Sequence, residues 1–120
     1  MDISYRELKR RADIAKERLR DCGICPRNCY VNRAAGKKDA CGEDARIRIS
    51  STGPHFGEEP PISGKRGSGT IFFTGCHSRC VFCQNFQISH QHTGDYITEQ
   101  ELAQHMLNLE KQNTHNINCL

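Results

Sequence analysis

Three cysteines lie within eight residues, Cys76, Cys80 and Cys83, in the spacing C-x3-C-x2-C. Thiolates are soft ligands that suit zinc or iron–sulfur clusters. Closed sites of either kind take four ligands, so three local thiols predict a metal centre with one coordination position left for another molecule. The alternative is a structural zinc loop that recruits His77 or Cys119 as its fourth ligand. For Cys119 itself we expect a small buried core residue instead of a ligand.

Four more cysteines lie nearer the N-terminus, Cys22, Cys25, Cys29 and Cys41, in the spacing C-x2-C-x3-C-x11-C. Four thiolates in one short segment predict a closed metal site. Zinc would staple a segment that has no core of its own, whereas an auxiliary iron–sulfur cluster would relay electrons, and both remain open. We do not expect disulfides, because the chain shows no secretory leader.

The triplet of cysteines directly follows a compact apolar run over residues 70–74, which is bounded by Gly69 and Gly75. Such a run predicts a strand buried on both faces, as in a parallel sheet. A capping-box pattern then opens a helix over residues 99–112, and residues 116–120 alternate as a second strand would. We therefore expect a parallel βαβ unit with the cysteine loop at the carboxyl end of its first strand, where α/β folds bind ligands.

A second helix is predicted near the N-terminus, over residues 5–20. Ser4 and Glu7 form a capping-box pattern, and apolar residues recur at spacings of three and four. We expect this apolar stripe to dock on another element.

The segment between the predicted N-terminal helix and the predicted βαβ unit is rich in Gly and Pro, which break helices. Residues 21–45 predict a metal-stapled knuckle, and residues 46–50 alternate like a short strand. Residues 51–69 hold several Gly and Pro and predict extended chain too broken for a helix. The expected division is residues 1–50 for the helix and four-Cys segment, 51–69 for the lead-in and 70–120 for the βα part.

The position just before Cys83 is the aromatic Phe82, which gives C-x3-C-x-aromatic-C. This pattern resembles the signature of the radical SAM superfamily. Further stretches resemble its pyruvate formate-lyase activating enzyme-like branch, namely residues 22–29, 53–61, 67–73 and 83–85. The resemblance covers about residues 20–119.

The resemblance implies an oxidoreductase of the radical SAM kind. Cys76, Cys80 and Cys83 would hold a [4Fe–4S] cluster, and S-adenosylmethionine would bind its remaining iron. Reductive cleavage would then give a 5′-deoxyadenosyl radical. Phe82 would flank the adenine, with ordinary loop packing as the alternative, and Asn85 would contact a cluster sulfur or the cofactor, with a turn cap as the alternative.

The same resemblance implies an α/β fold, the N-terminal part of a partial (β/α) barrel of radical SAM type, preceded by a helix and a Cys-rich metal-binding knuckle. A barrel of this kind needs about 200–250 residues, so we expect a piece of a longer protein. A flavodoxin- or ferredoxin-like protein would supply electrons. The resembled activating enzymes install a glycyl radical on a partner protein, whereas the motif residues leave the hydrogen donor of this protein open.

The charge and hydropathy of the chain bear on its partners and its location. The net charge is +3, and 13 of the 17 Lys and Arg lie in residues 1–48. We favour a solvated helix face over nucleic-acid binding. No apolar run approaches about 18 residues and the start is charged throughout, so we expect a cytoplasmic protein without a membrane span. The alternative function is a two-site zinc protein whose basic face binds nucleic acid or a protein.

Other polar residues show no spacing typical of a site. Glu58 and Glu59 are adjacent and would point to opposite sides of an extended chain. Four histidines lack ligand spacing with either cysteine set, and we expect solvated or capping roles for them: His55, His90, His92 and His105.

Overall fold

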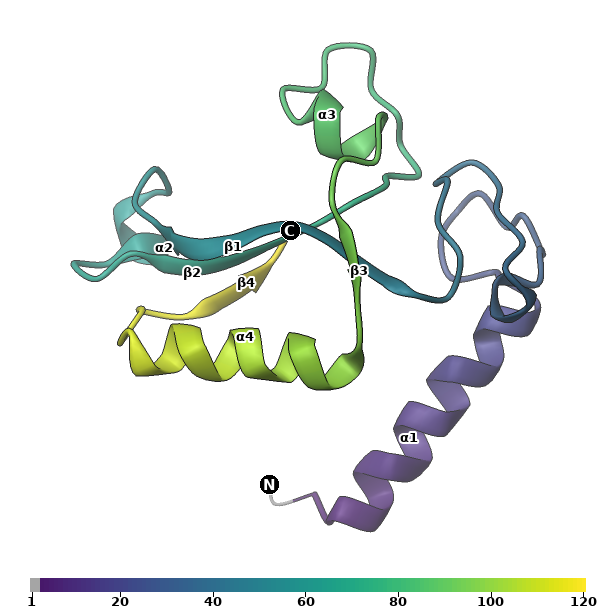
Figure 1. Ribbon diagram of the computed structural model, residues 1–120, viewed down its shortest axis with the longest axis horizontal. Coiled ribbons are helices and arrows are strands. Elements are labelled where there is room, and N and C mark those ends of the chain that lie inside the picture. Colours follow the sequence, from purple (N-terminus) through teal and green to yellow (C-terminus); the bar gives the residue numbers. More distant parts are fainter. Residues whose placement is uncertain (1–2) are drawn as a thin grey trace. The chain divides into compact units, whose positions relative to one another are not determined.

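Helices and strands alternate along the computed structural model, which describes residues 3–120 as a mixed α/β fold (Figure 1). The chain divides into two units, one comprising residues up to Ala45 with Cys76–Cys80, the other Arg46–Gly75 with Val81–Leu120. The helices are α1 Tyr5–Glu17, α2 Pro60–Ser63, α3 Phe86–Ser89 and α4 Glu99–Lys111, with 3-10 turns at Arg18–Arg20 and Arg33–Ala35. The strands are β1 Ile47–His55, β2 Ser68–Phe73, β3 Asp95–Ile97 and β4 Ile117–Cys119.

The first unit opens with α1. Its N-cap is Ser4, whose hydroxyl accepts from the backbone N–H of Glu7 at 3.3 Å, as the sequence predicts. The helix ends at Glu17 and continues as a 3-10 turn, so the predicted range is confirmed with a tighter last turn. No residue of α1 is buried, and Tyr5 is 83% exposed. The expected docking of its apolar stripe is therefore absent from the described part of the first unit.

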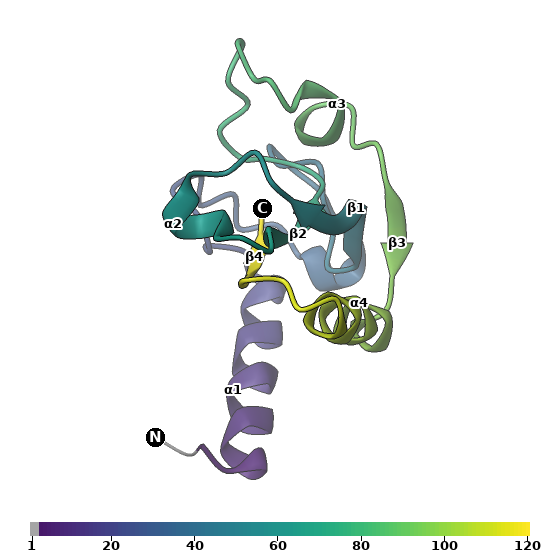
Figure 2. The same cartoon turned by 90° about the vertical axis from the view of Figure 1, so that its left-hand side faces the viewer.

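The second unit contains a four-stranded sheet in the order β3-β1-β2-β4. β1 pairs antiparallel with both β2 and β3, while β2 pairs parallel with β4. The connection β2–α4–β4 confirms the predicted βαβ unit (Figure 2). The α/β fold thus contains a sheet with both parallel and antiparallel pairs, and the barrel stays a prediction.

The core of the second unit lies between the sheet and α4. Ile49, Ile71 and Leu109 are buried together, and Ile71 is fully inaccessible. Further apolar residues pack against this cluster: Ile47, Phe73, Ile97, Leu102 and Met106. Because side chains alternate along a strand, the face of β2 that carries Phe72 points away from α4.

Helix α4 starts at a complete capping box. The Thr98 hydroxyl accepts from the Glu101 backbone N–H at 3.2 Å, and the Glu101 carboxylate accepts from the Thr98 backbone N–H at 2.7 Å. Each bond satisfies a backbone donor that the first turn leaves open. The predicted start of this helix is confirmed.

A polar seam joins β2 to β4 on the face away from α4. Ser68 is fully buried; its hydroxyl lies 2.7 Å from Asn116 Oδ1 and accepts from Asn118 Nδ2 at 2.7 Å. Gly69 allows close approach on the other face, since a Cβ there would lie 2.7 Å from Thr114 Oγ1. The two strands are therefore held by side chains as well as by their backbone ladder.

Three local expectations are corrected. The strand predicted over 46–50 continues as β1 to His55, because residues 52–55 pair with β2 in spite of Gly53 and Pro54. Within the Gly- and Pro-rich lead-in, α2 forms one helical turn with Pro at its first positions, where the missing N–H costs nothing. Cys119, which the sequence places in a buried core, lies exposed on β4.

Within residues 3–120, none of the helices combines the length and the apolar character needed to cross a bilayer.

Candidate functional site

The cysteine loop begins where β2 ends. Gly75 has φ 79°, a left-handed conformation that suits glycine, and its N–H donates to the Ile88 carbonyl at 2.9 Å. The preceding N–H of Thr74 donates to the Arg48 carbonyl at 3.1 Å. These bonds fix the end of the strand and place Cys76 directly beyond it, as predicted.

The loop backbone stabilises the thiolate form of its first cysteine. Backbone N–H donation from Ser78, and next from Arg79, holds the pKa of Cys76 below its ordinary value. Arg79 has φ 49°, which is uncommon for a residue with a Cβ. The thiolate is the form that binds metals, so the loop favours ligation at Cys76.

The same loop packs on the four-Cys segment within the first unit. The Arg27 Nε donates to the His77 carbonyl at 2.9 Å, and an Arg79 guanidinium nitrogen donates to the Ala40 carbonyl at 3.3 Å. These two bonds join segments that are 50 and 39 residues apart. They explain why Cys76–Cys80 belongs to the N-terminal unit.

Two polar side chains lie in a row beside Cys83, the third cysteine of the triplet. Cys83 Sγ lies 3.2 Å from the hydroxyl of the buried Ser89, which lies 2.8 Å from His90 Nδ1. The His90 ring stacks on Phe86 at a centroid distance of 4.7 Å. A thiolate only accepts, so with Cys83 ionised Ser89 donates to sulfur and His90 donates to Ser89.

The remaining predicted residues of the triplet region lie at the surface. Cys80 is exposed, and Phe82 is 86% exposed, so the ordinary loop packing considered for Phe82 is not seen. Asn85 occupies the N-cap position of α3, yet its side chain makes no capping hydrogen bond, so the turn-cap role is not seen either. The cofactor roles of Phe82 and Asn85 stay predictions.

One of the N-terminal cysteines lies beside an arginine. Cys22 is buried, with an Arg33 guanidinium nitrogen 4.0 Å from its sulfur. The Cys29 thiol donates to the Cys22 carbonyl at 3.7 Å, and the Cys41 thiol donates to the Glu43 carbonyl at 3.9 Å. The fourth member, Cys25, is half-buried.

Both cysteine sets fit metal ligation by the chemistry of their donors. All eight cysteines are free thiols. Across residues 3–120, however, no three His, Cys, Asp or Glu side chains are gathered closely enough to hold a metal ion. The two ligand sets therefore stay predictions that depend on residue type and spacing, and at Cys76 also on the lowered pKa of its thiol.

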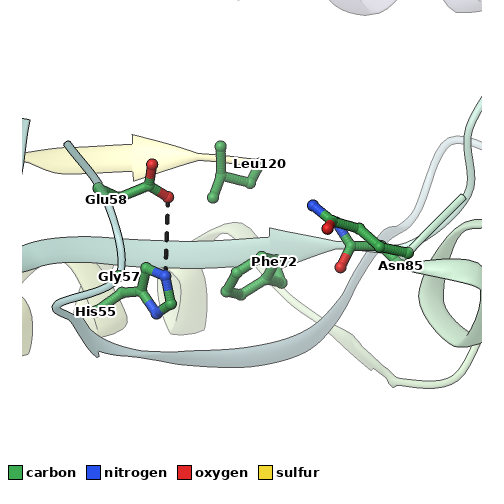
Figure 3. Close-up of a pocket in the computed structure, with 7 residues that line it drawn as sticks. His55, Gly57, Glu58, Phe72, Asn85 and Leu120 are labelled. Atoms are coloured by element: carbon green, nitrogen blue, oxygen red, sulfur yellow. Dashed lines mark ion pairs between the residues drawn. The ribbon is translucent and has the colours of Figure 1, made fainter.

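A cavity of about 560 Å³ lies on the second unit, on the side of β2 that faces away from α4 (Figure 3). At one end of it, His55 Nε2 and Glu58 Oε1 are 3.9 Å apart. Its lining includes His55, Glu58, Phe72, Gln84, Asn85 and Leu120. The sequence offered only the three-residue spacing of His55 and Glu58 as a signal. The side chain of His55 is 45% exposed, which agrees with the solvated role expected for it, and it also lines this cavity.

Comparison with known proteins adds evidence for the cysteine loop. Residues 62–120 match the family model of a 4Fe-4S single cluster domain. An uncharacterized protein of Methanocaldococcus jannaschii is 40% identical over 82 residues, which is 66% of this chain and 22% of that relative. The chain thus spans about a fifth of the length of the relative that it matches. No solved structure matches.

The matched segment contains Cys76, Cys80 and Cys83 and excludes the four N-terminal cysteines. Its description agrees with the soft three-thiol donor set at the end of β2. The comparison and the loop together support a 4Fe–4S cluster domain within residues 62–120.

Proposed function

We propose that the protein is a radical SAM enzyme of the pyruvate formate-lyase activating enzyme-like branch. The observation that carries this proposal is the C-x3-C-x2-C triplet, which follows the buried strand β2 inside the segment matched by a 4Fe–4S domain. When bound, the cluster supplies the electron that cleaves S-adenosylmethionine to methionine and a 5′-deoxyadenosyl radical.

The residues of the chain have separate tasks in this proposal. Cys76, Cys80 and Cys83 provide three ligands, which leaves one iron of a four-iron cluster for the cofactor. The N–H groups of Ser78 and Arg79 favour the Cys76 thiolate, and the Ser89 hydroxyl is placed to donate to Cys83.

The N-terminal cysteines support a second metal site in the proposal. Zinc and an auxiliary iron–sulfur cluster both suit a four-thiolate donor set. A flavodoxin- or ferredoxin-like donor would deliver the electron, and the substrate would be a partner protein. This chain spans 22% of its relative. The cleavage of S-adenosylmethionine is therefore proposed for the complete enzyme.

The test is anaerobic reconstitution of the full chain with iron and sulfide, followed by incubation with dithionite and S-adenosylmethionine. We expect a brown protein with about four irons at the triplet and formation of 5′-deoxyadenosine, measured by mass spectrometry. Cys80→Ala should remove the triplet iron and the 5′-deoxyadenosine. Exposed Cys119, outside both sets, provides the matched control as Cys119→Ala.

A colourless protein that binds only zinc and rejects iron and sulfide would contradict the proposal. That outcome would favour the two-site zinc protein instead. Iron binding without cleavage of S-adenosylmethionine would retain the cluster domain and reject the radical SAM activity.

A further inference from the structure

The apolar stripe of α1 has the spacing that a helix shows where it packs in a coiled coil. Its members recur at alternating intervals of three and four residues: Tyr5, Leu8, Ala12, Ala15 and Leu19. Such spacing aligns one narrow face of a helix, the face that another helix covers. Leu8 is 55% exposed, and in both views the rest of the first unit gathers at the C-terminal end of α1 (Figures 1 and 2). Within the described part of that unit, the stripe is therefore left uncovered.

Both flanks of this stripe are basic. In the heptad repeat that the spacing defines, Lys9 and Lys16 lie along one side of the stripe, and Arg11 and Arg18 lie along the other. The acidic residues of the helix occupy heptad positions outside the stripe and its flanks: Glu7, Asp13 and Glu17. The charges of α1 are thus sorted by position, and we call the four cationic residues beside the stripe the basic flanks.

Helix α1 is held in shape by bonds between its own side chains. The Glu7 carboxylate accepts from Arg10 Nε and from Arg11 Nε, each at 2.8 Å. The Glu17 carboxylate accepts from Arg20 Nε at 2.9 Å. Pairs three and four residues apart stabilise a helix that has little tertiary packing. A preformed helix loses less conformational entropy on binding, and Arg11 keeps 61% of its side chain exposed for a partner.

The basic flanks and the small residues of the stripe distinguish between possible occupants. A second copy of α1 would place basic flank against basic flank in either orientation, and such like charges destabilise a pair of helices. A lipid surface binds through large apolar side chains, whereas Ala12 and Ala15 supply two of the five residues of the stripe. Small residues let a facing helix approach closely. The stripe therefore suits a helix whose own flanks are acidic.

We propose that α1 docks a helix of another protein, one with Leu or Ile on its apolar stripe and Glu or Asp along both flanks. The carboxylates of that helix would face the basic flanks, and its apolar side chains would cover Tyr5 and Leu8. This inference does not rest on the function proposed above, because α1 contains no cysteine and lies outside the matched residues 62–120. Failure of the radical SAM proposal would appear in the reconstitution experiment and would leave this one intact.

The test measures binding of the full chain, without added iron, to two synthetic helical peptides by isothermal calorimetry. Both peptides span three heptads, about 21 residues, with Leu and Ile on the stripe; one has Glu on both flanks and the other has Lys. We expect the Glu peptide to bind at least about tenfold more tightly, with a smaller difference at high salt. Equal affinity for the two peptides, or no binding of the Glu peptide, would overturn the proposal.

Variants in matched pairs locate the docking face. Leu8→Ala should weaken binding of the Glu peptide about tenfold, whereas Ile14→Ala, which is exposed outside the stripe, should leave it unchanged. Lys9→Glu reverses a flank charge and should weaken binding about threefold. Arg6→Glu makes the same change of charge outside the flanks and should have little effect. Equal losses within either pair would refute the assignment, and circular dichroism checks that each variant keeps its helix.

Two further measurements test the other occupants. In co-sedimentation with vesicles of phosphatidylserine and phosphatidylcholine, we expect no binding that Leu8→Ala removes. In analytical ultracentrifugation, we expect no dimer that Leu8→Ala dissociates. A positive result in the first experiment would assign the stripe to a lipid surface, and one in the second would assign it to a second copy; either would overturn the proposal.

Discussion

The hydrogen bond between Ser89 and Cys83 predicts a change in reduction potential when the hydroxyl is removed. Ser89 Oγ lies 3.2 Å from Cys83 Sγ, and His90 Nδ1 lies 2.8 Å from the same hydroxyl. With a thiolate ligand at position 83, the hydroxyl donates to sulfur. Donors to cluster sulfurs stabilise the more negatively charged, reduced state and so raise the potential. Ser89→Ala should therefore make the potential more negative.

The size of the shift follows from the worth of such a bond. A hydrogen bond to a charged group contributes about 1.5–3 kcal/mol, and only its difference between the two oxidation states moves the potential. If that difference is about 1 kcal/mol, the shift is about 40 mV for one electron, because a tenfold change in equilibrium constant is about 59 mV. The expected effect is thus tens of millivolts.

The assay is a redox titration of the reconstituted protein, followed by electron paramagnetic resonance of the reduced cluster. Ser89→Thr keeps a hydroxyl and should retain most of the original potential. Ser51→Ala removes an exposed hydroxyl on β1 and should leave the potential unchanged. A Ser89→Ala potential that is unchanged or more positive would refute the reasoning, as would an equal shift in Ser51→Ala.

Four further predictions concern ligation and stability. Cys80→Ala should lose the iron of the triplet and retain metal at the N-terminal cysteines, measured as metal content per chain. Leu109→Ala should lower the free energy of unfolding by about 2–5 kcal/mol in urea titrations, because Leu109 is 2% exposed in the core. Thr98→Ala should cost about 1 kcal/mol, whereas Ser4→Ala, at the start of a helix with no buried residue, should reduce helix content and leave the unfolding midpoint of the second unit unchanged. Hydrogen bonds from the Thr98 backbone N–H, and next from its hydroxyl, hold the pKa of Glu101 below its ordinary 4.5. The stability that the Glu101 carboxylate contributes is therefore present above pH 4.5 and is lost as the pH falls toward the lower folded value. Lowering the pH below 4.5 should reduce the urea midpoint less in Glu101→Gln than in the unchanged protein.

Local signals in the sequence were sufficient for the main helices and the central strand. The capping box at Thr98 and the apolar run of β2 are short-range patterns, and both produced the predicted elements. The three residues of β3 were missed, because that strand is defined by pairing with β1, nearly fifty residues earlier. The extension of β1 through Pro54 was hidden for a similar reason, since its partner Gly69 is distant in sequence.

The candidate site likewise has one part that the sequence predicts and another that it does not. The position of Cys76 after a buried strand follows from neighbouring residues and was predictable. The cavity was not, because it depends on His55, Phe72, Asn85 and Leu120 reaching one side of the sheet from four separate segments. The hydroxyl of Ser89 beside Cys83 also depends on the turn into α3, which no sequence pattern indicated.

The hydrogen bonds of buried Ser68 with the half-buried Asn116 and Asn118 have a consequence for the accuracy of folding. Sliding β4 by a single residue along β2 would turn the asparagine amides toward the apolar side occupied by Leu109 and strand the serine hydroxyl without partners. Mispaired sheets would thus carry buried amides with no acceptor, a penalty of about 1–3 kcal/mol for each unsatisfied group. These three polar side chains thereby favour the native register of β4 on β2 over a shifted one during folding.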